Sequence, residues 1–140
     1  EKDLINQLSQ DNIIVAGGGG GIPVIEEDGG YRGLASVIDK DFASAKLAQL
    51  IGADLLMILT AVDHVALNFN KENQVWLDHM NLEEAKKYRD EGHFLPGSML
   101  PKVEACIDFV ENNPGKKAII TSLSKAEEGF NQTCGTLIEE

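Results

Sequence analysis

The feature that most constrains this chain is a run of five glycines at residues 17–21, directly after the apolar segment NIIVA at residues 12–16. A short β-branched segment of this kind predicts a strand buried on both faces of a sheet. Glycine loses more conformational entropy on folding than any other residue, so regular elements do not tolerate five in succession. Backbone N–H groups in such a loop can converge on an anion, because no Cβ keeps the ligand away. We therefore expect a ligand to approach this loop; the alternative is a flexible turn between two strands.

Predicted strands and helices alternate along the rest of the chain. Periodicity and capping residues predict helices at residues 4–8, 40–51, 81–90 and 101–112. Apolar runs predict strands at residues 55–60, 65–69, 117–121 and 135–138, the last of them at a sheet edge. Composition predicts an exposed loop at residues 26–35. This alternation with short connections indicates a three-layer α/β/α sandwich with a mainly parallel sheet. Ligands bind such sheets beyond the carboxyl ends of the strands.

Particular residues mark the ends of two of these helices. Asp39 is suited to cap the helix that begins at Lys40, and Gly52 is suited to end it in the left-handed conformation. Asn81, with Glu84 three residues later, matches a capping box at the start of the next helix.

The net charge of the chain is −11, from 12 basic and 23 acidic residues. Sequence-independent nucleic-acid binding and attraction to anionic membranes both depend on clustered Lys and Arg, so we expect neither. Nucleotide binding stays open, because a few local lysines can hold one triphosphate. Cys106 and Cys134 are too few for a secreted disulfide framework, and no apolar run has the length of a membrane span. We expect free thiols in a cytoplasmic protein, with a further part before Glu1 because the chain opens inside a helical pattern.

Two lysines at predicted helix starts are candidates for anion binding. Lys102 follows a loop that contains two prolines and stands where the helix dipole disfavours a cation, a position that suits a lysine facing a bound anion. Lys40 stands between Asp39 and Asp41 at the start of another helix. The alternatives are an exposed surface lysine in the first case and plain helix capping by the aspartates in the second.

The remaining reactive side chains do not form a recognisable pattern. His64, His79 and His93 lack metal-ligand spacing, so we predict no metal site built from protein side chains. The spacing supports no Cys-His arrangement either, and Trp76 is expected to pack against its surroundings or lie at the surface.

Four segments together resemble one known family. GGGGIPV, VIDKD, ILTAVDHV and GHFLPGSMLPK occur in this order, followed by a tail with IITSL and GT. This pattern is similar to the carbamate kinases of the amino acid kinase superfamily and covers nearly the whole chain. Acetylglutamate, aspartate and UMP kinases resemble it only around the strand that ends in Thr60 and the Pro-Lys helix start.

The resemblance implies a role for each matching residue. Lys40 and Lys102 lie along the path of phosphoryl transfer, and Asp41 orients them. The active-site loop near the phosphate or carbamate end contains Gly18, Gly19 and Gly20. The nucleotide pocket is lined by Thr60, Val62, His64, Pro96 and Met99.

The resemblance also implies a reaction and its setting. Carbamate kinases transfer a phosphoryl group between carbamoyl phosphate and ADP with Mg²⁺, as cytoplasmic homodimers in arginine metabolism. Residues 1–140 correspond to the C-terminal part that binds ATP or ADP, and the N-terminal half that completes the acceptor site lies outside this chain. Two alternatives stay open: another amino acid kinase with a different acceptor, and a nucleotide-binding domain without catalysis. Lysines around the moving group suit the chemistry, because phosphoryl transfer depends on positioning and positive charge.

Overall fold

The computed structural model describes residues 2–140 and is built around a four-stranded sheet in the order β3-β7-β8-β6. These strands are β3 (Leu55–Thr60), β7 (Lys117–Ser122), β8 (Thr136–Glu139) and β6 (His79–Asn81). β3 pairs with β7 and β6 with β8 in parallel, whereas β7 and β8 are antiparallel. The mainly parallel sheet is therefore confirmed. The edge position predicted for residues 135–138 is wrong, because β6, which was not predicted as a strand, forms the edge beside β8.

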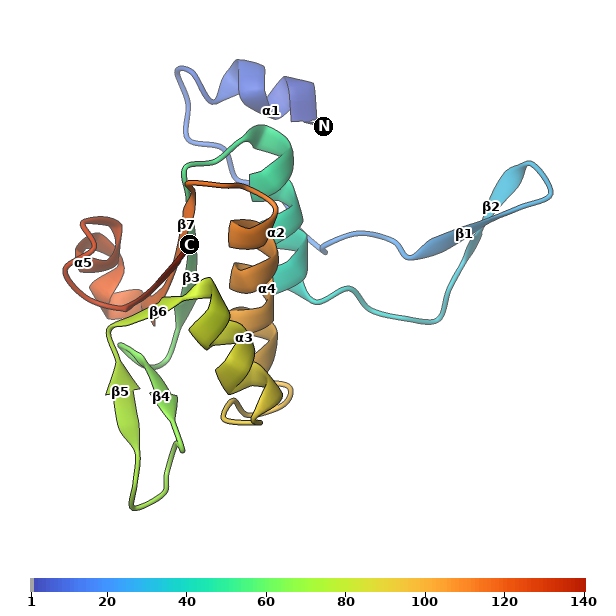
Figure 1. Cartoon of the computed structure of the whole chain (residues 1–140). Helices are drawn as coiled ribbons and strands as arrows, with labels where there is room; N and C mark the ends of the chain where they lie inside the picture. The colour runs from blue at the N-terminus through green and yellow to red at the C-terminus, as the bar shows by residue number, and fades with distance from the viewer. Residues whose placement is uncertain (1) are drawn as a thin grey trace.

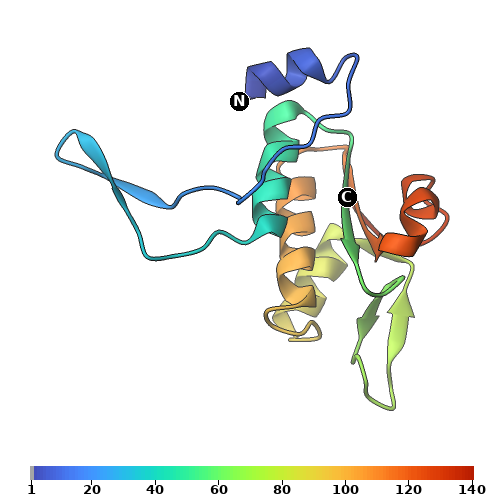
Figure 2. The same cartoon turned by 180° about the vertical axis from the view of Figure 1, so that it is seen from behind.

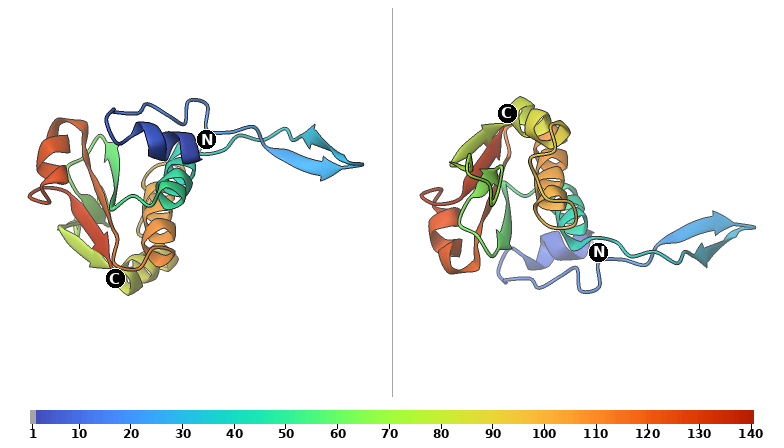
Figure 3. Two further views of the ribbon diagram at one scale, coloured as in Figure 1. Left: turned by 90° about the horizontal axis from the view of Figure 1, so that it is seen from above. Right: turned by 90° about the horizontal axis from the view of Figure 1, so that it is seen from below.

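Helices cover both faces of this sheet, which confirms the three-layer architecture (Figure 3). One face carries α2 (Lys40–Ile51), α3 (Leu82–Asp90) and α4 (Met99–Glu111). The short α5 (Ala126–Phe130) lies on the other face, and α1 (Lys2–Leu8) contacts α2 (Figures 1 and 2). A Cβ added at Gly129 of α5 would stand 2.7 Å from Thr121 Cγ2, so glycine lets α5 approach the sheet.

The main core lies between the sheet and α4. Phe109 and Val110 of α4 are completely buried against Ile120 and Ile138 of the sheet and Met80 of β6. Burying one side chain of this size stabilises the fold by about 1.5–3 kcal/mol. This layer therefore fixes α4, and with it the residues at the start of α4.

The predicted helix ends are confirmed by their hydrogen bonds. The backbone N–H of Asp41 donates to Asp39 Oδ1 at 2.8 Å, and Gly52 ends α2 with a φ of 71°. Asn81 and Glu84 form both hydrogen bonds of the capping box. Helix α4 begins at Met99 rather than at residue 101.

The strand predicted at residues 12–16 is absent, because no described strand lies beside this segment. Ile13 and Val15 are each 98% exposed, and a strand needs a partner to satisfy its backbone groups. The loop predicted at residues 26–35 is exposed as expected but is largely a hairpin. It joins β1 (Val24–Glu27) to β2 (Gly30–Gly33) and projects from the body of the molecule (Figure 1). Its turn, at residues 28–29, has positive φ at both positions, the pattern that an Asp-Gly pair signals.

A second hairpin stands at the carboxyl end of β3. The strand predicted at residues 65–69 is confirmed as β4 (Val65–Leu67), which pairs antiparallel with β5 (Val75–Leu77). None of the helices among residues 2–140 has the length and apolar character of a membrane span.

Candidate functional site

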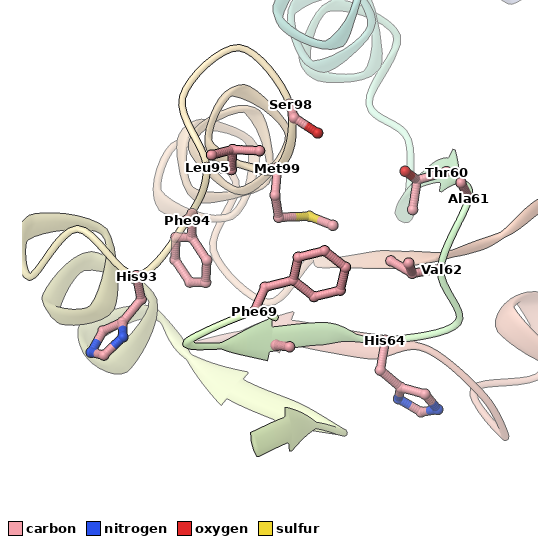
Figure 4. A pocket seen from close by; sticks show the side chains of 11 residues that line it. Thr60, Ala61, Val62, His64, Phe69, His93, Phe94, Leu95, Ser98 and Met99 are labelled. Atoms are coloured by element: carbon pink, nitrogen blue, oxygen red, sulfur yellow. The ribbon is translucent and has the colours of Figure 1, made fainter. Parts of the chain in front are cut away.

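A cavity of about 240 Å³ opens at the carboxyl end of β3 (Figure 4). One wall comes from the β3–β4 connection and the β4–β5 hairpin, and the other comes from the loop before α4. The lining residues are Thr60, Ala61, Val62, His64, Ala66 and Phe69 on the first wall, and His93, Phe94, Leu95, Ser98 and Met99 on the second.

The interior of the cavity is mainly apolar. Figure 4 shows the side chains of Val62, Phe69 and Met99 directed toward its centre, whereas the rings of His64 and His93 point away. Ligand sites typically combine such apolar walls with a small number of polar groups, and here the hydroxyls of Thr60 and Ser98 stand at the upper rim in this view. The cavity therefore suits a flat, largely apolar group such as an aromatic base.

Four of the five residues predicted for the nucleotide pocket line this cavity, and Pro96 does not. Pro96 is exposed and occupies a turn in which the N–H of Ser98 donates to the carbonyl of Leu95 at 3.2 Å. The turn directs the proline outward, so its neighbours Leu95 and Ser98 take the lining positions.

Sequence reasoning missed seven lining residues: Ala61, Ala66, Phe69, His93, Phe94, Leu95 and Ser98. Phe69 also packs edge-on against Trp76 with ring centroids 6.1 Å apart, which agrees with the packing role expected for the tryptophan. The available signal was an aromatic residue at the end of a predicted strand that follows directly on the Thr60 segment.

The imidazole ring of His64 contacts residues that lie outside the cavity. Its Nε2 lies 3.7 Å from the Sγ of Cys134, a contact that the spacing of the sequence did not indicate. Its Nδ1 lies 3.2 Å from Asp78 Oδ1, but the geometry is poor for a hydrogen bond, and this buried nitrogen has no other partner among residues 2–140. His64 therefore contributes to the wall through its position in the β3–β4 connection.

An ion pair joins the starts of α2 and α4. Lys102 Nζ lies 2.8 Å from Asp41 Oδ2, and the two side chains are only 22% and 20% exposed. The pair stands one turn of α4 away from Met99 of the cavity. Asp41 therefore contacts Lys102, one of the two lysines that it is expected to orient, and its role in orienting them stays a prediction. Beneath the pair, burial raises the pKa of the Cys106 thiol, and the carboxylate of Asp41 adds to this rise.

Lys40 faces a second, wider hollow of about 650 Å³ that the glycine loop also lines. Gly18 and Gly20 contribute to this surface, whereas Gly19 does not. The N–H of Gly20 donates to the carbonyl of Gly17 at 2.6 Å, and all three of Gly17, Gly18 and Gly20 have positive φ. The exposed Lys40 carries no ion pair within the part of the chain that the structure describes. The glycine run thus adopts backbone angles that glycine tolerates best, next to a lysine that is free to meet an anion.

Apart from Pro96 and Gly19, the predicted residues thus lie in three places: a cavity, an ion pair and a glycine-lined hollow. That the amino groups of Lys40 and Lys102 share one cleft stays a prediction. Among residues 2–140, no group of three His, Cys, Asp or Glu side chains is arranged to hold a metal ion.

The model of the amino acid kinase family matches residues 1–122. The chain belongs to the amino acid kinase family. It is 52% identical over 139 residues to a carbamate kinase-like protein of Escherichia coli K12 and to a carbamate kinase of Clostridium perfringens. These matches cover 99% of this chain but only 45% and 44% of the relatives, so the chain spans less than half their length.

Solved structures agree with this assignment. A carbamate kinase from Giardia lamblia, bound to AMP-PNP, superimposes with a TM-score of 0.90 at 41% identity. The match covers 99% of this chain and 44% of that one. This chain therefore has the same fold as the matching part of the Giardia protein.

Proposed function

We propose that this chain supplies the nucleotide-binding part of a carbamate kinase, which transfers a phosphoryl group between carbamoyl phosphate and ADP to give ATP and carbamate. The observation that carries the proposal is the part-buried pair of Lys102 and Asp41, one helical turn from an apolar cavity. The 52% identity to a carbamate kinase of Clostridium perfringens supports this choice of reaction. The AMP-PNP complex of the Giardia protein supports nucleotide as a ligand of the family.

In this proposal the cavity takes the base and ribose. Val62, Phe69 and Met99 offer the base an apolar surface, and each Å² of apolar surface that binding removes from water contributes about 25 cal/mol. The phosphates extend from the cavity mouth toward the start of α4, where Lys102 stands. This arrangement places the fixed charge at the phosphate end and the apolar contacts at the base end.

The chemistry needs positive charge around the moving phosphoryl group more than it needs covalent help. Asp41 holds the ammonium group of Lys102 in one direction, so no side-chain ordering is required at the moment of transfer. Lys40 adds a second charge from the glycine-lined hollow. Mg²⁺ adds charge stabilisation on the phosphate oxygens. Mg²⁺ typically binds in such enzymes through substrate phosphates and water, with one or two carboxylates from the protein.

Two other functions are weaker candidates. No residue of this chain specifically favours a kinase with a different acceptor. In the proposal, the acceptor site is formed mainly by the N-terminal half of the relatives, which this chain does not match. A domain without catalysis is disfavoured because Lys40, Asp41 and Lys102 are all present.

We place the complete protein in the cytoplasm, as a homodimer in arginine metabolism. The free thiols of Cys106 and Cys134 agree with a reducing compartment.

The function is tested by ATP formation from carbamoyl phosphate and ADP in the complete enzyme and in its Lys102→Ala variant. We expect kcat to fall on the order of 10²–10³-fold with a small change in ADP affinity, as when one transition-state donor is removed. Lys116→Ala is the matched control, because it also removes a paired lysine. Lys116 pairs with Asp54 at the amino ends of β3 and β7, whereas the cavity opens at the carboxyl end of β3. A Lys102→Ala enzyme with normal kcat and a raised KM for ADP would show that Lys102 only anchors the nucleotide. No ATP formation by the unsubstituted enzyme would reject the reaction itself.

A further inference from the structure

Thr136 is a completely buried polar residue on β8. Its hydroxyl accepts a hydrogen bond from the backbone N–H of Val65 at 2.7 Å and donates one to the backbone carbonyl of Leu77 at 2.5 Å. The two partners lie 71 and 59 residues before it in the sequence. One side chain therefore joins three segments that are distant along the chain.

Val65 and Leu77 face each other in the register of the β4–β5 hairpin, in the pair farthest from its tip. The hydroxyl of Thr136 relays a hydrogen bond between the strands at this base and ties both strands to β8. A neighbouring bond strengthens the attachment, because the N–H of Leu137 donates to the carbonyl of Asp78 at 3.0 Å. An isolated two-stranded hairpin is marginally stable in water, so its position depends on such attachments.

This hairpin carries much of one wall of the 240 Å³ cavity. His64 directly precedes Val65, and Ala66 and Phe69 lie on or beside β4. The opposite wall comes from residues 93–99, which belong to the loop before α4 and the first residue of that helix. The separation of the two walls is therefore set by how the hairpin is fixed to the sheet.

We propose that Thr136 is a positioning residue for the nucleotide site, whose hydroxyl holds the hairpin wall at the separation that the base requires. The proposal rests on the proposed function, in that the cavity binds the nucleotide base. Thr136 touches neither the cavity nor the reacting atoms and acts through Val65 and Leu77. Valine has the same shape but leaves the buried N–H of Val65 and the carbonyl of Leu77 without a partner, which drives both groups toward water.

The test compares three variants of the chain. Thr136→Val removes the hydroxyl, Thr136→Ser keeps it, and Ile138→Val trims an equally buried residue of β8 that makes no contact of this kind. Affinity for Mg-ADP is measured by titration calorimetry, and stability by thermal unfolding. We expect Thr136→Val to weaken binding about tenfold, which corresponds to about 1.4 kcal/mol. Thr136→Ser and Ile138→Val are expected to bind within about twofold of the unsubstituted chain, even where Ile138→Val lowers the unfolding temperature comparably.

Amide hydrogen exchange at Val65 gives a second readout that does not depend on nucleotide. We expect exchange at Val65 to accelerate in Thr136→Val and to stay slow in Thr136→Ser and Ile138→Val. Unchanged nucleotide affinity in Thr136→Val, or equal weakening in Ile138→Val, overturns the positioning role. If the folded, unsubstituted chain binds no Mg-ADP, the proposed function fails, and the exchange rate of Val65 alone then decides whether the hydroxyl fixes the hairpin.

Discussion

The pair of Lys102 and Asp41 is expected to be energetically coupled, and a double-mutant cycle measures that coupling. Lys102→Met and Asp41→Asn each remove one charge while nearly preserving side-chain size. Each single variant leaves a part-buried charge without its partner, so each is expected to destabilise the fold. The double variant leaves neither charge, so its loss of stability is expected to be smaller than the sum of the two single losses.

The size of this coupling follows from the geometry. At the observed 2.8 Å, two unit charges attract by about 1.5 kcal/mol in bulk water and about 6 kcal/mol at an effective dielectric constant of about 20. About a fifth of each side chain remains exposed, and desolvation and side-chain ordering offset most of the attraction. We therefore expect a coupling free energy of about 1–2 kcal/mol.

The same chain contains a matched control pair. Lys116 lies 2.5 Å from Asp54, but the side chain of Asp54 is 93% exposed. The cycle of Lys116→Met and Asp54→Asn is therefore expected to give a much smaller coupling that added salt abolishes. Both coupling free energies are obtained from urea unfolding curves that are monitored by circular dichroism. A Lys102–Asp41 coupling no larger than that of the exposed pair would refute the view that these helix starts hold a fixed charge.

Three further predictions concern the body of the fold. Gly129→Ala is expected to cost about 1–3 kcal/mol in urea unfolding, because the added methyl overlaps Thr121, and trimming that residue to serine should restore part of the loss. A disulfide reagent such as dithiobis(nitrobenzoate) is expected to modify one thiol in the folded chain and both after unfolding, because Cys106 is buried and its thiol pKa is raised. Lys117 lowers the pKa of Glu139, so this carboxylate stabilises the fold above its unfolded pKa and loses that effect as pH falls through its folded pKa. The free energy of unfolding should accordingly be lower in Glu139→Gln than in the unsubstituted chain near neutral pH, and this difference should become smaller toward acid pH.

Local signals explain what the sequence could predict. Asp39, Gly52 and Asn81 mark helix ends through hydrogen bonds to their immediate neighbours, so their effect is visible in a few residues of sequence. The apolar strands β3 and β7 are likewise identified by their own composition. The Asp-Gly turn of the projecting hairpin was readable in the same way and was overlooked.

Features that depend on distant parts of the chain were not predictable from such signals. Residues 12–16 have the composition of a buried strand, but no neighbouring strand is present among residues 2–140 to pair with them. The inner position of β8 depends on β6, whose three residues carry no strand pattern. The contact between Cys134 and His64 joins residues 70 positions apart.

For the candidate site, the resemblance supplied most residues and the fold supplied their arrangement. Lys102 could be singled out as a cation at a helix start, but its partner Asp41 is 61 residues away, and only the packing of α2 on α4 joins them. Phe69 was missed because its role depends on where the β4–β5 hairpin stands relative to the loop before α4.

In the proposed function this chain holds the nucleotide site but not the whole acceptor site, and one paired measurement tests both parts. Mg-ADP is titrated calorimetrically into the folded chain, and ATP formation is assayed after carbamoyl phosphate is added. Weak binding without ATP formation is expected. The apolar cavity is present, whereas the lysines act on phosphates that still face water, where each charge contributes little. A folded chain that binds no Mg-ADP would contradict the nucleotide site, and robust ATP formation would contradict the assignment of the acceptor site to the other half.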